Sequence, residues 1–139
     1  MKPATSLIIF TVLSGFGFGL LFWLNLNLHS HVNFPNRISF PLAFLISISG
    51  LISSSFHLGN PQRALLAFTQ WRSSWLSREA VLAVATLAIS FINAVLIEIY
   101  GVYLDWIGFV AASFCLLTIF STAMIYTQMK TVPQWNMKI

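Results

Sequence analysis

Charged side chains are scarce in this sequence: seven Lys or Arg and three Asp or Glu among 139 residues, or 7%. A soluble domain is about a quarter charged, so these side chains are too few to cover a surface that faces water. The net charge of +4 reflects the shortage of acids rather than a basic patch, which argues against a nucleic-acid partner. With 58% apolar residues, the composition instead predicts a bilayer protein.

Cysteine and histidine are also few. The single Cys115 lies in an apolar run and cannot by itself form a disulfide framework, a zinc site or an iron–sulfur cluster. His29 and His31 have no carboxylate or thiol nearby in the sequence, so a solvated turn is favoured over a metal site. No two histidines are placed to hold a haem within the bilayer, so we expect neither haem nor metal.

Four long stretches carry no charge at all, and each is long enough to cross a bilayer as a helix. We predict an all-α integral membrane protein, a bundle of four transmembrane helices forming one domain over residues 1–139. The spans are expected near residues 4–28, 38–58, 78–98 and 105–128. No stretch alternates polar and apolar residues over the length of a barrel strand. The first apolar run is longer than a signal-peptide core, so we expect it to be retained.

The distribution of basic residues predicts the orientation. If the N-terminus is cytoplasmic, six basic residues are inside and only Arg37 is outside, while Glu98, Asp105, His29 and His31 are outside. The six are Lys2, Arg63, Arg72, Arg78, Lys130 and Lys138. The positive-inside rule therefore places both termini in the cytoplasm, in a cell inner membrane.

The links between the spans differ in length. Residues 59–77 form the longest link, and Asn60-Pro61 is typical of a helix start, so a short interfacial helix is expected near 61–72. Residues 100–104 are expected to form a tight turn. Within the spans, small residues favour close helix packing, although space for a flat ligand is the alternative. They are the Gly15 and Gly19 pair with Ser14 and Gly17 nearby in the first span, and Ser47, Gly50 and Ser54 on one side of the second.

Two ionisable residues near the inner ends of the spans are the best functional candidates. His57 lies at the inner end of the second span, and its imidazole suits hydrogen bonding to a quinone carbonyl and proton transfer. An interfacial His bonded to water or lipid is the alternative. Glu79 lies just inside the third span, and Ser77 is expected to cap that helix. An acid in the first turn suits the positive end of the helix dipole. Glu79 is also a candidate proton acceptor. Arg63, Arg72 and Arg78 form a cationic rim, for lipid phosphates or an acidic partner surface.

Several motifs resemble one family. The run His57-Leu-Gly-Asn-Pro-Gln-Arg63-Ala, followed by Ser74-Trp-Leu-Ser77-Arg-Glu79, resembles the signature of the dimethyl sulfoxide reductase membrane-anchor family. Ile125-Tyr126 and Thr131-Val-Pro-Gln-Trp135 match a second piece. The opening Lys2-Pro-Ala, Phe10-Thr and Ser14-Gly is similar to the anchors of cytoplasmic sulfite dehydrogenases in that family.

The resemblance implies a function for the chain. Such anchors hold an iron–sulfur subunit and a molybdopterin catalytic subunit, exchange electrons with membrane quinone, and generally carry no haem. His57 and Glu79 would correspond to quinone-site residues, and Gly59, Pro61 and Arg63 would shape the loop beneath the iron–sulfur partner, with Arg72 and Arg78 beside it. The molybdopterin and the clusters would belong to partners, and the chain would have no complete active site of its own.

One departure and two rival functions remain. The family usually has about eight spans and this sequence has four, so it is expected to be either a truncated copy or a half-length form. The cytoplasmic link would put the partners inside the cell, which favours sulfite oxidation over an exported sulfoxide reductase. A purely structural membrane subunit is the main alternative. A small transporter is disfavoured because no charge lies near the middle of a span.

Overall fold

The structure is a computed structural model that describes residues 5–26, 36–55, 70–72 and 74–127. Within these residues there are four helices and no strand, which confirms the predicted all-α architecture. The helices are α1 (Thr5–Asn25), α2 (Asn36–Ser55), α3 (Trp75–Glu98) and α4 (Asp105–Thr127).

The helix ends that the structure describes lie within three residues of the predicted spans, while the predicted end of the second span, at 58, lies outside the described residues. One difference is the start of α3. The sequence predicted a start at Arg78 with Ser77 as the cap, whereas α3 begins at Trp75 and its N-cap is Ser74. Ser74 has extended backbone angles, and its carbonyl accepts the Arg78 amide at 3.1 Å. The prediction was wrong because Ser74 and Ser77 look alike as caps in the sequence. Ser77 instead lies inside α3 and is buried, and the Ser74 side chain makes no cap hydrogen bond.

Three of the helices are long and apolar enough to cross a membrane, namely Ile8–Asn25 within α1, and the whole of α3 and α4. The apolar part of α2, Ile38–Ser54, is shorter. Between α3 and α4 the chain makes the predicted tight turn. Gly101 takes a φ of 63°, and the Val102 amide donates to the Leu96 carbonyl at 2.9 Å, a bond that folds the chain back onto the last turn of α3.

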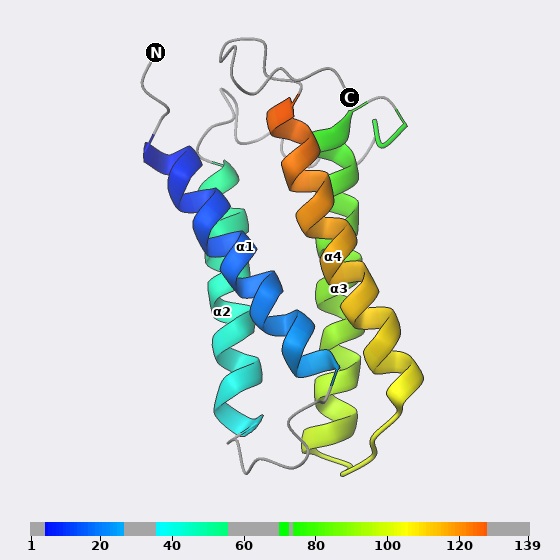
Figure 1. Ribbon diagram of the computed structural model, residues 1–139. Coiled ribbons are helices and arrows are strands. Elements are labelled where there is room, and N and C mark those ends of the chain that lie inside the picture. The colour runs from blue at the N-terminus through cyan, green and yellow to red at the C-terminus, as the bar shows by residue number, and fades with distance from the viewer. Residues whose placement is uncertain (1–4, 27–35, 56–69, 73, 128–139) are drawn as a thin grey trace.

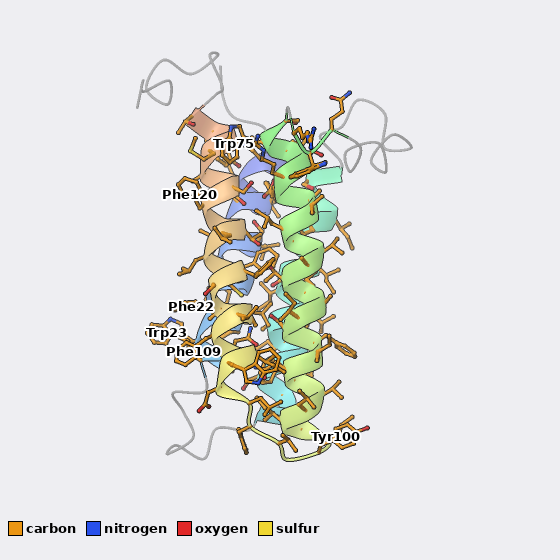
Figure 2. All side chains as sticks on the ribbon, turned by 90° about the vertical axis from the view of Figure 1, so that its right-hand side faces the viewer. Phe22, Trp23, Trp75, Tyr100, Phe109 and Phe120 are labelled. Atoms are coloured by element: carbon orange, nitrogen blue, oxygen red, sulfur yellow. The ribbon has the colours of Figure 1, made fainter. Side chains whose placement is uncertain are left out.

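The helices form two pairs, α1 with α2 and α3 with α4, and α1 also packs along α4 (Figure 1). The start of α1 and the end of α4 lie at the same end of the bundle, together with the end of α2 and the start of α3. Trp75 and Phe120 are close to this end, and Tyr100 is at the other (Figure 2). The apolar core lies between the pairs and includes Phe18, Leu21, Phe40 and Cys115. Cys115 is fully buried within the bundle.

Small residues bring α1 and α2 together, and four of those named from the sequence make the contact: Ser14, Gly17, Ser47 and Gly50. A Cβ atom at Gly17 would lie 2.6 Å from the Ser47 amide nitrogen, and one at Gly50 would lie 2.5 Å from that of Ser14. At Gly15 and Gly19, by contrast, a Cβ atom would meet nothing within 4 Å among the described residues. The expectation of close packing is therefore confirmed at Gly17 and Gly50, whereas the open faces of Gly15 and Gly19 leave the alternative of a ligand space.

Candidate functional site

Glu79 is an acidic side chain inside the bundle. Its residue is 3% exposed, and the Thr122 hydroxyl of α4 donates to the carboxyl oxygen Oε1 at 2.5 Å. Because α3 begins at Trp75, Glu79 lies in its second turn rather than in the first, so the predicted interaction with the helix dipole is replaced by this bond across to α4. A buried ionisable group in a membrane helix is a candidate functional residue.

The neighbours of Glu79 are small and polar. Ser77 is buried, and the Ser121 hydroxyl of α4 donates to the Trp75 carbonyl at 3.4 Å. Farther into the bundle, Thr86 of α3 and Thr118 of α4 bond to each other through their hydroxyls at 2.8 Å. The α3–α4 interface is therefore held by hydroxyl groups at the end where the carboxyl lies.

Arg78 joins the start of α3 to the chain before it. Its Nε donates to the Trp71 carbonyl at 3.0 Å and a terminal nitrogen donates to the Arg72 carbonyl at 2.8 Å. The guanidinium also lies 4.5 Å from the centre of the Trp75 ring, and that of Arg72 lies 5.8 Å from the Trp71 ring. Residues 70–72 form a turn rather than the end of the interfacial helix expected there; the rest of that helix, 61–69, lies outside the described residues.

The other predicted site residues lie outside the described part of the chain: His57, Gly59, Pro61 and Arg63, as do His29 and His31. What the structure does show is the end of α2. Ser55, the last described residue of α2, is at the end of the bundle where α3 begins (Figure 1). The link that carries these residues therefore starts and finishes at the end where Glu79 lies.

A groove runs between α1 and α4 at the same end of the bundle, with a volume of about 690 Å³. Most of its lining is apolar, from Ile8, Val12, Phe18, Ile119 and Ala123. Its polar lining comprises four hydroxyl-bearing residues: Thr11, Ser14, Thr122 and Tyr126. Thr122 therefore both lines the groove and bonds to Glu79.

Farther along the bundle lies a second set of buried polar side chains that the sequence did not single out, because the candidate functional residues were chosen among ionisable groups. The Asn25 amide of α1 donates to the Ser90 hydroxyl at 2.8 Å, and the Asn93 amide donates to the Asn25 carbonyl oxygen at 3.0 Å. A signal was available, since Glu79, Thr86 and Asn93 recur every seven residues on α3, as expected of one packed helix face.

The remaining acids lie at the opposite end, where α3 finishes and α4 begins. Asp105 is exposed in the first turn of α4, and Glu98 is partly buried, with no hydrogen-bond partner for its Oε1 among the described residues. Within the described residues, no group of three or more His, Cys, Asp or Glu is placed to hold a metal ion.

These features define a class of protein: a membrane protein of long apolar helices that pack through glycine, serine and threonine around a buried carboxyl. Comparison with known proteins then identifies the family. Residues 1–139 match the profile of the DMSO reductase anchor subunit (DmsC), and the chain belongs to that family. The resemblance drawn from the motifs is confirmed.

A curated relative is similar over nearly the whole chain. It is a subunit of sulfite dehydrogenase from Allochromatium vinosum, and it is 31% identical over 164 aligned positions. The alignment covers 98% of this chain and 48% of the relative, so the chain spans about half the length of the protein it matches. No solved structure matches the chain.

Proposed function

We propose that the chain is the membrane-anchor, quinone-interacting subunit of a molybdopterin and iron–sulfur oxidoreductase of the sulfite dehydrogenase or dimethyl sulfoxide reductase type. The observation that carries the proposal is the buried Glu79 carboxyl, held by Thr122 at the end of the bundle that the motif-bearing link adjoins. Membership of an anchor-subunit family and the name of the curated relative support it.

The partners, an iron–sulfur subunit and a molybdopterin catalytic subunit, dock on the link between α2 and α3 at the cytoplasmic face of the inner membrane. Arg72 and Arg78 lie at this end, whereas Glu98 and Asp105 lie at the other, and the positive-inside rule assigns the basic end to the cytoplasm. A reporter fused after Ile139 tests the orientation: activity typical of the cytoplasm is expected, and activity typical of the opposite side would contradict it.

The chemistry at the site is the interconversion of quinone and quinol, in which a quinone takes up two electrons and two protons. The electrons come from, or return to, the partner's iron–sulfur clusters. His57 hydrogen-bonds one carbonyl oxygen, and Glu79 relays protons between the ring and the cytoplasmic face. A carboxyl with one fixed hydroxyl donor keeps its second oxygen available for a proton, which suits this role.

Glu79→Gln and His57→Ala, made separately in the intact complex, test the function. Each is expected to abolish quinone-linked turnover while the catalytic subunits still react with a soluble dye, because dye bypasses the membrane site. Glu98→Gln, at the opposite end of the same helix, is the matched control and is expected to be active with both acceptors. Unimpaired quinone turnover in both site variants would reject the assignment and leave a purely structural tether.

A further inference from the structure

The groove between α1 and α4 has an ordered distribution of polar and apolar groups. Thr11 and Tyr126 bond to each other across it, close to the start of α1 and the end of α4. Thr122 and Ser14 follow about one turn farther into the bilayer, and Phe18 and Ile119 line the groove beyond them. Because Tyr126 is the penultimate residue of α4, the polar part is at the aqueous end and the apolar part extends into the membrane.

Ser14 gives the groove a polar group that the described helices leave unused. The residue is 2% exposed, and its hydroxyl has no hydrogen-bond partner among the described residues. An unsatisfied buried hydroxyl is costly, by about 1–3 kcal/mol for a typical group, so such atoms call for an explanation. A ligand that carries a hydrogen-bond acceptor would satisfy it.

The adjacent glycine keeps the groove open. Among the described residues, a Cβ atom at Gly15 would meet nothing within 4 Å, although Gly15 is beside Ser14 and lines the groove. Gly17 and Gly50 differ from Gly15, because each lies against the backbone of a neighbouring helix at close range. The face of α1 that carries Gly15 is therefore not used to pack α1 against the described helices.

The groove is also continuous with the functional site, because one of its lining residues holds Glu79. The Thr122 hydroxyl donates a hydrogen bond to the Glu79 carboxyl, so a polar group of a ligand beside Thr122 would lie close to Glu79. A second groove, of about 610 Å³ between α2 and α3, lacks this continuity. It is lined by Phe40, Phe44, Phe91 and Glu98, at the opposite end of the bundle.

We propose that the α1–α4 groove is a lateral binding site for an isoprenoid quinone, with the polar ring beside Ser14 and Thr122 and the prenyl tail along Gly15, Phe18 and Ile119. This rests on the proposed function and adds the place where the quinone enters. A volume of about 690 Å³ and a mostly apolar lining with few polar groups are typical of small-molecule sites. The polar end facing water and the apolar end facing lipid fit an amphiphile with this order of parts.

In a bilayer the tail gains no hydrophobic energy by leaving lipid, so the groove acts by shape and packing. Filling it is therefore expected to exclude the tail sterically. Gly15→Leu narrows the groove from α1, and Ala123→Leu narrows it from α4. Gly19→Leu is the matched control, since its site is equally open but is not part of the groove lining.

The assay uses the intact complex with sulfite as reductant and two acceptors: a benzoquinone with a short prenyl tail, and the same ring without a tail. In Gly15→Leu and Ala123→Leu, the KM for the prenylated quinone is expected to rise about tenfold, within the range that overfilling an occupied site costs. The kcat, the KM for the tailless ring and dye reduction should be nearly unchanged. Gly19→Leu should match the unaltered protein throughout.

Other results would overturn the proposal. Equal losses in Gly15→Leu and Gly19→Leu, with a lower yield of complex, would show a helix-docking face. Unchanged kinetics in both groove variants would show that the quinone enters elsewhere. Photolabelling with a prenylated azidoquinone gives a separate readout: label is expected on residues 11–18 or 119–126, and label confined to α2 or α3 would reject the groove. Labelled groove residues without quinone-linked turnover would instead refute the proposed function alone.

Discussion

The bond from Thr122 to Glu79 gives the sharpest test of how the bundle holds its buried acid. Thr122→Val keeps the shape of the side chain and removes its hydroxyl. The Glu79 carboxyl then loses a donor at 2.5 Å, and at 3% exposure it lies too deep for bulk water to replace that donor. The variant is therefore expected to destabilise the α3–α4 interface.

The expected size follows from two scales. Hydrogen bonds to charged groups contribute about 1.5–3 kcal/mol to stability. Side-chain bonds between membrane helices average about 0.6 kcal/mol and reach about 1.7 kcal/mol at most. A short bond to a buried carboxyl belongs near the top of the membrane range, so we expect Thr122→Val to lower the free energy of unfolding by about 1.5 kcal/mol.

Thr118→Val is the control for removing a hydroxyl from α4. Thr118 pairs with Thr86, but Thr86 also bonds to the Leu82 carbonyl at 2.7 Å, so the loss leaves no isolated polar group. A cost of about 0.6 kcal/mol is expected. Thr122→Ser, which restores the donor, should recover most of the loss.

The assay is unfolding in mixed micelles by titration with a denaturing detergent, followed by tryptophan fluorescence. The reasoning would be refuted if Thr122→Val cost no more than Thr118→Val. It would also be refuted if Thr122→Ser were as unstable as Thr122→Val, because the hydroxyl would then contribute nothing.

Three further outcomes are expected. Gly17→Ala forces a Cβ atom to within 2.6 Å of the Ser47 amide nitrogen and should lower the unfolding free energy by about 2 kcal/mol or more. Gly19→Ala should leave the unfolding free energy unchanged or raise it. The same detergent titration measures both variants. Asn25→Leu should lower the unfolding free energy by about 1–2 kcal/mol because it removes the acceptor of Asn93 and the donor to Ser90. Equal stability of the variant would show that these hydrogen bonds do not contribute to stability. Arg78→Lys should weaken retention of the proposed partner subunits on purified membranes nearly as much as Arg78→Gln, since a point charge cannot hold both carbonyls. Full rescue by Lys would show that charge alone matters.

The sequence was a good guide to the helices because their signal is compositional. Apolar runs free of charge mark α1, α3 and α4, and the acids Glu98 and Asp105 mark the turn between the last two. The start of α3 was harder, since Ser74 and Ser77 are chemically equivalent caps and only tertiary packing distinguishes them.

The site was predictable in part. An acid beside a span is rare enough to attract notice, so Glu79 was identified, but its partner Thr122 is 43 residues away and one of several threonines on α4. Which glycines face a neighbour depends on helix rotation, and so the sequence named Gly15 and Gly19 together with Gly17 and Gly50, although only the last two make packing contacts within the described residues. Rotation about a helix axis is poorly encoded when apolar residues surround the whole helix.

The pairing of helices has a consequence for how the chain assembles during synthesis. Neighbours along the sequence form α1–α2 and α3–α4, so each hairpin is able to associate soon after it enters the bilayer. The contact of α1 with α4, where Gly108 approaches the Asn25 backbone, joins the helix that leaves the ribosome first to the one that leaves it last among these four. The contact between α1 and α4 therefore cannot form until the second hairpin has entered the bilayer, so the two hairpins are joined only after both have been inserted.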